Sequence, residues 1–497
     1  MSDVIWESAV ELARALESGD LKSTDVTSAF LERSRAVGPT LGAYLEITED
    51  RALEAARSAD DRRAKGQAAS VYDGIPIAYK DLFSTKGVRT TAGSRILESW
   101  VPPYDSTVVA KGNQAGLPML GKTNMDEFAM GSSTENSGYE VARNPWDPDC
   151  VPGGSSGGSA AIVAAGGAPW AWGTDTGGSV RQPASLCGIV GVKPTYGRVS
   201  RYGIVAFASS LDQASPFTRT VKDAAALLQI VAGHDPMDST SIAERAPDLL
   251  SGIEDGIDGM RIGVVREFRG EGIQPGVRTR VDEAYERLAR LGASLEEISL
   301  PSFEHGISAY YLVAPAEASA NLARYDGVRY GLRVPGEDIV EMTSKTRDEG
   351  FGAEVKRRVM LGTYALSAGY YDAYYGKAQK VRTLIIDELE EAYSNLDLIV
   401  CPTSPTTAFK LGERTDNPLE MYLSDIFTVP VNLAGNAGIS VPCGLSPDDG
   451  LPVGLQVIAP ALDEATMFRA AYAFEQDLDW IDSPEGRPPL DIEEVTT

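Results

Sequence analysis

Two serines of this chain stand in glycine-rich settings that suit acyl-transfer chemistry. Ser155 lies in GGSSGG and Ser179 in DTGGS, within the stretch 152–188. Glycine lets successive backbone N–H groups converge on one point without a clash from Cβ. Convergent N–H groups are what the oxyanion of a tetrahedral intermediate requires. The pattern therefore predicts a paired-serine site in which one hydroxyl is the nucleophile.

A serine hydroxyl needs a base before it can attack a carbonyl carbon. Histidine is nearly absent, because the chain holds only His234 and His305. Lys80 follows the apolar run GIPIAY and precedes Asp81. If that run is a buried strand, burial disfavours the ammonium and leaves a neutral amine able to accept a proton. The alternative is an ordinary surface pair between Lys80 and Asp81, and the residues alone leave both interpretations open.

Three other motifs overlap the same stretch. Residues 153–157 (GGSSG) match the nucleophile elbow of α/β-hydrolases, which needs a catalytic histidine after the serine, and neither histidine stands in a motif. Residues 175–177 (DTG) match an aspartic-protease motif, but the chain has no second such carboxylate. A phosphate-binding loop needs Lys and then Ser or Thr after its last glycine, and Gly158 is followed by Ser and Ala. The paired-serine interpretation is favoured.

Longer segments resemble the amidase signature family. They are GGSSGGS (153–159), GTDTGGSVRQPA (173–184) and CGIVGVKPTYGRVSRYG (187–203), with Ser155 and Ser179 24 residues apart and Lys80 75 residues before Ser155. The resemblance implies that Ser179 is the nucleophile, that Ser155 follows a cis peptide bond and relays the proton, and that Lys80 is the base. It also implies an oxyanion hole made by the backbone N–H groups of Thr176, Gly177, Gly178 and Ser179.

Further segments resemble one branch of that family, the A subunits of glutamyl-tRNA(Gln) amidotransferases. They include 124–137, 205–216, 316–331, 354–382 and 424–440, and the likeness runs over about residues 5–475. Trp170 and Trp172 depart from it, since smaller apolar residues usually stand there. The branch implies a glutaminase that supplies ammonia for amidation of Glu-tRNA(Gln), Asp-tRNA(Asn) or both.

The resemblance also implies partners. It predicts a heterotrimer completed by the amidotransferase B and C subunits, in which the B subunit uses ATP and Mg²⁺ and makes most of the contact with the misacylated tRNA. We expect no cofactor or metal on this chain, and it has no nucleotide-binding motif.

Free glutamine is a zwitterion, so its site needs a cation for the carboxylate and an anion for the ammonium. Arg358 and Asp425 resemble the family's residues for these two tasks, and an arginine fork suits a carboxylate. Arg357 remains the alternative to Arg358. The resemblance also points to Tyr310, with Tyr311 equally possible, and to Ser132 as pocket residues.

Two other functions stay open on the sequence. A stand-alone amidase of the same family would act on a small or bulky amide and would need neither Arg358 nor Asp425. A catalytically inactive scaffold would only bind partners. The presence of Lys80, Ser155 and Ser179 together argues against this function.

The elements that must position these residues alternate between helix and strand. Residues 5–65 are predicted to be helical, with Ser23 or Thr24 and Thr48 as caps, and residues 306–395 mostly helical. Helices are also predicted at 217–233 (capped near Thr220) and 276–291, and strands at 261–265, 396–401, 438–442 and 453–458. Short apolar runs stand at 74–79, 117–120, 160–165 and 189–192, and within 151–216 we expect tight turns that lead into strands and a buried helix.

This alternation predicts an α/β fold, and the resemblance implies a central mixed β-sheet covered by helices on both faces. We expect one amidase domain over residues 1–480. Its parts are a helical beginning (1–65), a signature core (70–235), a helical pocket region (300–395) and sheet-completing strands (396–475), with an acidic loose tail at 481–497.

Composition limits the surroundings of the chain. With 497 residues, 43% of them apolar, it can bury a large core, and a net charge of −26 repels nucleic-acid backbones. Four cysteines without a CxxC pair predict neither disulfide nor zinc site. The sequence has no apolar run of about 20 residues, the length that a membrane-spanning helix needs, and its first residues do not resemble a signal peptide. We therefore expect a cytoplasmic protein.

The acidic balance also generates a prediction about salt. Only 13 of the 45 basic residues are Lys, and salt relieves the repulsion among excess carboxylates by screening it. We expect the melting temperature of the protein to rise as salt is added across a titration series. Full stability at low salt would contradict adaptation to a salt-rich cytoplasm.

Overall fold

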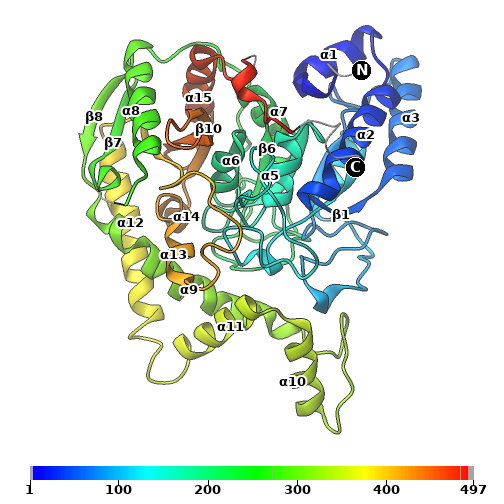
Figure 1. The fold of residues 1–497 in the computed structure, drawn as a ribbon, viewed down its shortest axis with the longest axis vertical. Helices are drawn as coiled ribbons and strands as arrows, with labels where there is room; N and C mark the ends of the chain where they lie inside the picture. The colour runs from blue at the N-terminus through cyan, green and yellow to red at the C-terminus, as the bar shows by residue number, and fades with distance from the viewer. Residues whose placement is uncertain (1–3, 271, 482, 491–497) are drawn as a thin grey trace.

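A single twisted sheet runs through the whole molecule (Figure 1). The computed structural model describes residues 4–270, 272–481 and 483–490. Its 11 strands follow the order β1-β3-β2-β4-β6-β5-β10-β11-β9-β7-β8, with parallel and antiparallel pairs. The strands are β1 (Tyr44–Ile47), β2 (Ile77–Lys80), β3 (Met119–Thr123), β4 (Trp170–Thr174), β5 (Val190–Lys193), β6 (Ala214–Thr218), β7 (Arg261–Val265), β8 (Ser294–Ile298), β9 (Leu398–Pro402), β10 (Ala437–Leu445) and β11 (Pro452–Ala459).

Helices flank this sheet. α5 (Gly157–Ala164) and α6 (Arg181–Cys187) pack on each other and on the central strands, and all their residues are buried. α7 (Val221–Val231), α8 (Pro275–Arg290) and α15 (Glu464–Leu478) form another layer against the strands. The predicted α/β class, with one large domain around a mixed sheet, is confirmed. The remaining helices are α1 (Ala9–Ser18), α2 (Ser23–Leu41), α3 (Glu49–Ala64), α4 (Thr107–Gln114), α9 (Gly306–Asn321), α10 (Ile339–Gly350), α11 (Ala353–Ala365), α12 (Tyr375–Tyr393), α13 (Pro418–Leu423) and α14 (Val429–Ala434).

The pairing of β2 determines where the candidate residues meet. β2 lies between β3 and β4 and is parallel to both, so all three strands end at the same edge of the sheet. Lys80 is the last residue of β2 and Thr174 the last of β4. The loops that leave these two strands therefore begin side by side.

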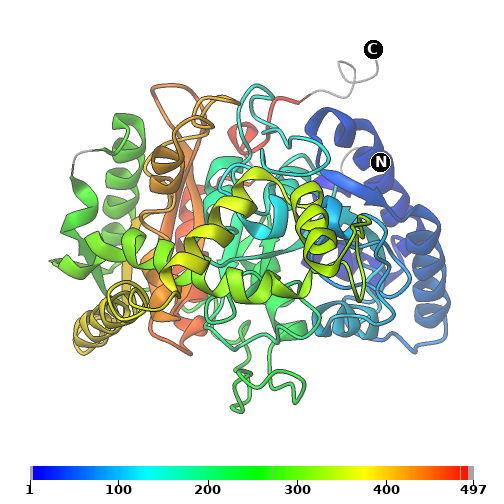
Figure 2. The same cartoon turned by 90° about the horizontal axis from the view of Figure 1, so that it is seen from below.

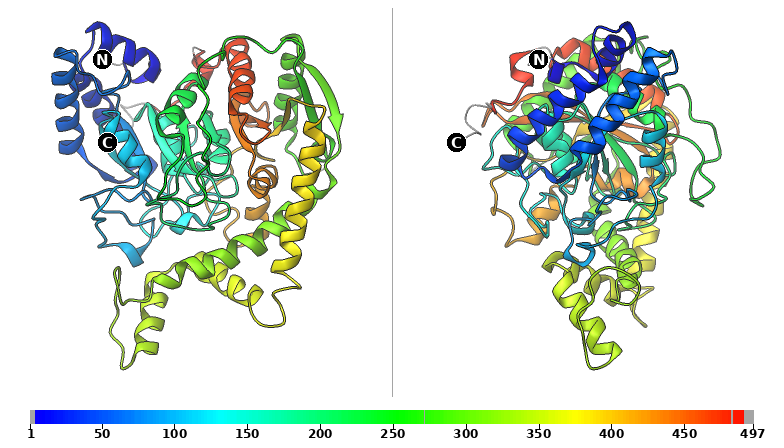
Figure 3. Two further views of the ribbon diagram at one scale, coloured as in Figure 1. Left: turned by 180° about the vertical axis from the view of Figure 1, so that it is seen from behind. Right: turned by 90° about the vertical axis from the view of Figure 1, so that its right-hand side faces the viewer.

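Helices α9 to α12 form an arm at one end of the sheet. Figure 1 shows α10 and α11 below the strands and α12 leading from them up toward β7, and Figure 2 shows these helices crossing the molecule when it is seen from below. From behind and from the side, the arm narrows toward α10 (Figure 3). The predicted helical region at 306–395 is this arm.

Two predicted helix caps work differently in the structure. α2 begins at Ser23, and the Asp60 carboxylate of α3 accepts from the N–H groups of Ser23 (2.7 Å) and Thr24 (3.1 Å). Thr48 precedes α3, but its hydroxyl donates to the Met119 carbonyl at 2.8 Å. Long-range partners thus replaced the expected local caps, whereas the hydroxyl of Thr220 caps α7 as predicted.

Other boundaries also differ from expectation. The region 5–65 contains the strand β1, and residues 217–218 end β6 instead of beginning a helix. Residues 491–497 of the expected tail lie outside the described residues. Within 483–490 the chain packs on the domain, since Arg33 donates to the Leu490 carbonyl and the Arg487 guanidinium lies over the Trp6 ring.

The four cysteines are all free and buried, as predicted. Burial raises the pKa of Cys150 and of Cys401 to about 12, so neither thiol is activated. In the part of the chain that the structure describes, no helix combines the length and apolar character needed to cross a bilayer.

Candidate functional site

Lys80 ends β2 in the interior, with no exposed surface. Its Nζ lies 2.8 Å from Ser155 Oγ, 2.8 Å from Ser156 Oγ and 3.1 Å from Thr174 Oγ1. Burial lowers the pKa of Lys80 to about 7, although the charges of nearby buried carboxylates oppose this shift. Near neutral pH a large fraction of this amine is therefore uncharged.

The three hydroxyls set the direction of proton transfer. A neutral amine has two N–H donors and one lone pair, whereas an ammonium has three donors and no acceptor. The Ser156 hydroxyl donates to the Thr174 carbonyl at 3.2 Å, so toward Lys80 it can only accept. If Thr174 Oγ1 takes the second N–H, the lone pair of the neutral amine is left for the hydroxyl proton of Ser155.

Ser155 follows a cis peptide bond from Gly154, as the resemblance implied. Ser179, the candidate nucleophile, is 8% exposed, and its hydroxyl makes no hydrogen bond among the described residues. The structure therefore joins Lys80 to Ser155 but leaves Ser179 unlinked to Ser155. Catalytic hydrogen bonds are often long without substrate and shorten only when it binds.

The loop from Asp175 to Ser179 presents backbone N–H groups beside the candidate nucleophile. Those of Thr176, Gly177 and Ser179 donate no hydrogen bond to any described residue, and so they are available to an oxyanion. The N–H of Gly178 instead donates to Asp175 Oδ1 at 2.9 Å. Gly178 therefore drops out of the expected set of donors, because its N–H is already used inside the loop.

A buried ion pair holds this loop. Arg181 binds Asp175 through Nε and Nη2 at 3.0 and 2.9 Å, and the Asn432 amide donates to Asp175 Oδ1 at 2.9 Å. Burial alone would raise the pKa of Asp175, but Arg181 and Asn432 lower it to about 2. The carboxylate thus stays charged, and its contacts with Arg181 and with the Gly178 N–H hold the loop in place.

Asp425 supplies a second carboxylate beside the same loop. Ser132 Oγ donates to its Oδ2 at 2.5 Å, while Oδ1 is buried without a partner among the described residues. A Cβ on Gly178 would lie 3.1 Å from this free oxygen. Burial raises the pKa of Asp425 to about 7, partly offset by Ser132. An unsatisfied buried acceptor is costly, and a cation placed there would satisfy it.

Arg358 is buried on α11, with 3% exposure. Its Nε donates to Glu354 Oε1 at 2.7 Å, and its guanidinium lies 5.1 Å from the Tyr311 ring and 5.3 Å from the Tyr422 ring. Its Nη atoms make no hydrogen bond with the described residues. The side chain of Arg357 also binds Glu354 but is 43% exposed, so the structure distinguishes the two arginines by burial.

The two candidate tyrosines face different partners. The Tyr310 ring covers Gly177, where a Cβ would come within 2.7 Å of it. The Tyr311 ring stacks on Tyr422 at 3.8 Å. Tyr310 thus lies against the nucleophile loop, and Tyr311 belongs to the surroundings of Arg358.

Sequence reasoning missed the residues that support the site. Ser156 follows Ser155 directly and Thr174 ends a strand, but no spacing rule links either of them to Lys80. Asp175 stood in the motif, although only the fold shows that it pairs with Arg181 and Asn432. Further buried supports are Glu354, Thr428, Gln182 and Asp126.

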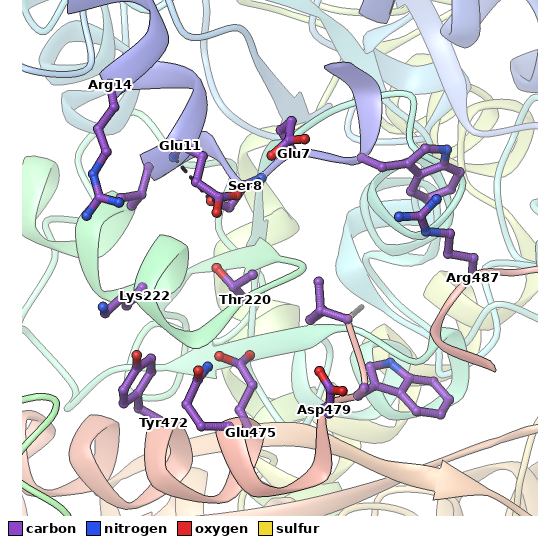
Figure 4. A pocket seen from close by; sticks show the side chains of 15 residues that line it. Glu7, Ser8, Glu11, Arg14, Thr220, Lys222, Tyr472, Glu475, Asp479 and Arg487 are labelled. Carbon is purple, nitrogen blue, oxygen red and sulfur yellow. Dashed lines mark hydrogen bonds between the residues drawn. The ribbon is translucent and has the colours of Figure 1, made fainter. Parts of the chain in front are cut away.

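Figure 4 shows a separate cavity of about 410 Å³ between α1, α7 and α15. Its labelled side chains include the acidic Glu11 and the basic Arg14 and Lys222. Burial raises the pKa of Glu475 to about 8, so this carboxyl is mostly protonated near neutral pH. The cavity contains none of the candidate residues. The described residues hold no group of three or more His, Cys, Asp or Glu side chains placed to bind a metal ion.

Comparison with known proteins shows what the chain is similar to. The amidase family profile matches residues 25–468. Two close relatives are each named as the A subunit of a glutamyl-tRNA(Gln) amidotransferase. That of Acidothermus cellulolyticus is 58% identical, covering 96% of this chain and 95% of its own, and that of Streptomyces coelicolor is 57% identical, covering 96% of both. The crystal structure of the corresponding protein from Thermotoga maritima superposes with a TM-score of 0.80 at 45% identity, covering 98% of each chain.

The close approach at Gly178 gives a test of the loop. Its φ is +137°, and a Cβ there would lie 2.1 Å from Thr428 Oγ1. We expect Gly178→Ala to displace the loop, to lower amide hydrolysis by at least ~100-fold and to lower the free energy of unfolding.

Gly233→Ala is the matched control for Gly178→Ala. Gly233 has a φ of +120° and no atom within 4 Å of its Cβ position, so only backbone strain remains. Equal effects of the two substitutions on unfolding and hydrolysis would show that the contact with Thr428 does not position the loop.

Proposed function

This chain belongs to the amidase family, in the branch of the glutamyl-tRNA(Gln) amidotransferase A subunits, and on that premise we propose that it hydrolyses glutamine through Ser179, Ser155 and Lys80. The observation that carries this proposal is the buried amine of Lys80, 2.8 Å from the Ser155 hydroxyl and with a pKa lowered to about 7. In a chain with only two histidines, this amine can act as the base that a serine nucleophile needs.

In the proposed reaction the Ser179 hydroxyl attacks the side-chain amide carbon of glutamine. Its proton passes to Ser155, whose own proton passes to Lys80. The free N–H groups of Thr176, Gly177 and Ser179 stabilise the oxyanion. The proton then returns through Ser155 to the amide nitrogen, ammonia leaves, and water hydrolyses the acyl-enzyme to glutamate.

Two charges hold the substrate in this proposal. The free Oδ1 of Asp425 accepts the α-ammonium, and the unpaired Nη atoms of Arg358 donate to the α-carboxylate. Tyr310 and Ser132 complete the pocket, since Tyr310 covers Gly177 and Ser132 orients Asp425. The buried acceptor without a partner and the guanidinium nitrogens without a hydrogen bond among the described residues support this assignment, because glutamine carries a matching group for each.

The ammonia serves a second reaction in the proposed complex. The B and C subunits complete a heterotrimer, and the B subunit uses ATP and Mg²⁺ to amidate Glu-tRNA(Gln), Asp-tRNA(Asn) or both. A net charge of −26 supports the expectation that the tRNA contacts mainly the partner. We propose that a chain with this activity works in the cytoplasm, where tRNA is aminoacylated.

The pKa values give the pH dependence of glutamine hydrolysis. Lys80 must be neutral and Asp425 ionised, and both pKa values are near 7, so both groups become active as pH rises. We expect log(kcat/KM) to rise with a slope approaching 2 below pH 6 and to level above pH 8. In Asp425→Asn the slope should fall to 1, because only Lys80 still titrates.

Two lysine substitutions test the base directly. Lys80→Met should abolish hydrolysis, as should Ser179→Ala. Lys193→Met is the matched control, since Lys193 is also buried with a pKa lowered to about 7 but, among the described residues, donates only to the Pro194 carbonyl. A full rate in Lys80→Met, or loss of hydrolysis only in Lys193→Met, would refute the proposed base.

Neighbouring arginines separate glutamine hydrolysis from the stand-alone amidase alternative. We expect Arg358→Ala to raise KM for glutamine about 10- to 100-fold, because a charge-assisted pair is lost, and Arg357→Ala to change it by less than about threefold. Hydrolysis of a small neutral amide should be unaffected by either. An unchanged glutamine KM in Arg358→Ala would favour an amidase that does not recognise an amino acid.

A further inference from the structure

The arm carries an exposed apolar surface away from the candidate site. Met360, Leu361 and Tyr364 on α11, Tyr370 and Tyr371 in the following loop, and Tyr374 just before α12 are between 38% and 66% exposed. We name these six residues the tyrosine surface. Exposed apolar side chains gathered on neighbouring segments in this way are typical of a protein–protein interface.

α11 is apolar on two sides, which a free surface helix does not need. Val355, Gly362 and Ala365 are buried on one side, and a Cβ on Gly362 would meet the Pro315 carbonyl of α9 at 1.8 Å. Met360, Leu361 and Tyr364 lie outside this contact. A helix that is apolar beyond its core stripe has a second surface to cover.

The tyrosines form a preassembled cluster. The ring of Tyr364 lies 4.5 Å from Tyr370, which stacks on Tyr374 at 5.9 Å. Tyr371 lies 5.3 Å from Tyr375. Rings already held by each other lose little conformational freedom on binding, and tyrosine is enriched among the residues that dominate interface energies.

The charge around the surface indicates its occupant. Six Lys or Arg and one Asp lie between residues 356 and 382, and three of the basic groups pair with Asp348 or Glu354. Lys377 and Lys380 are exposed and make no ion pair with the described residues. A second copy of this chain would bring these lysines against their own counterparts across a twofold axis. Two free lysines are also few for a nucleic-acid backbone, where six to ten phosphate contacts are usual.

We infer that the tyrosine surface is the docking site for the ammonia-consuming partner in the amidotransferase, a protein face with an apolar centre and acidic groups at its rim. This inference rests on the proposed function. The surface is linked to the site through α11, because the same helix carries Arg358 on its buried side and packs on α9, which carries Tyr310. The partner thus binds one of the two helices that carry the proposed glutamine-pocket residues.

The test is a binding titration of the full chain with a purified complex of the B and C subunits from the same organism. We expect Tyr364→Ala/Tyr371→Ala to raise Kd at least ~10-fold, as truncation of interface anchors does. Lys377→Glu/Lys380→Glu should also weaken binding and should reduce its dependence on salt. Val71→Ala/Met237→Ala is the matched control, since these apolar side chains are 64% and 60% exposed elsewhere on the molecule, and it should leave Kd unchanged.

The outcomes separate the docking surface from the function. Thermal unfolding and glutamine hydrolysis by each free variant should match the unsubstituted chain within about twofold. If the unsubstituted chain does not bind the complex of B and C subunits, the proposed heterotrimer is wrong. If it binds and the tyrosine variant binds equally well, the docking surface alone is wrong. Loss of tRNA binding by the free variant, with unchanged affinity for the partner complex, would overturn the inference in favour of a nucleic-acid surface.

Discussion

The removal of one amine from water is the constraint on which the rest of the site depends. Lys80 can accept a proton near neutral pH only because β2 ends inside the protein, beneath the start of α5. At the start of α5, Gly158 allows close packing on the chain next to β1 and β3, because a Cβ there would lie 2.6 Å from backbone atoms of Ala43 and Asn124. The hydroxyls of Ser155, Ser156 and Thr174 replace the water that burial removes. The glycine-rich stretch therefore supplies hydroxyl partners for the amine as well as N–H groups for the proposed oxyanion site.

The charges of buried carboxylates raise the pKa of Lys80 and so oppose part of the lowering that burial causes. Desolvation pulls it down, while Asp126, Asp175 and Asp212 pull it up, and the balance is about 7. Burial raises the pKa of Asp126 and of Asp212 to about 6, whereas Arg181 keeps Asp175 charged. The Asp175–Arg181 pair therefore has two effects, since it holds the nucleophile loop and also keeps a negative charge within range of the amine.

The sequence predicted those parts that depend on local pattern. Glycine and serine spacing singled out Ser155 and Ser179, and alternating elements predicted the sheet, whereas the apolar run before Lys80 left burial and a surface pair with Asp81 both open. It could not predict contacts between distant segments, such as Ser156 with Lys80, because side-chain distances follow from strand pairing. For the same reason the sequence did not show that the Gly178 N–H, expected to donate to an oxyanion, donates to Asp175 instead. The Asp60 carboxylate that caps α2 shows how a tertiary contact overrides a local capping rule.

The two halves of the candidate site come from different parts of the fold. The residues proposed to react therefore stand apart from those proposed to bind the substrate. Lys80, Ser155 and Ser179 belong to the sheet edge and its loops, whereas Arg358 and Tyr310 belong to the arm. The arm reaches the nucleophile loop where the Tyr310 ring covers Gly177. Because α9 and α11 pack on each other, one helix pair carries both Arg358 and Tyr310, whereas the buried amine belongs to β2. Substitutions on the arm can therefore change the proposed substrate contacts without touching the proposed base.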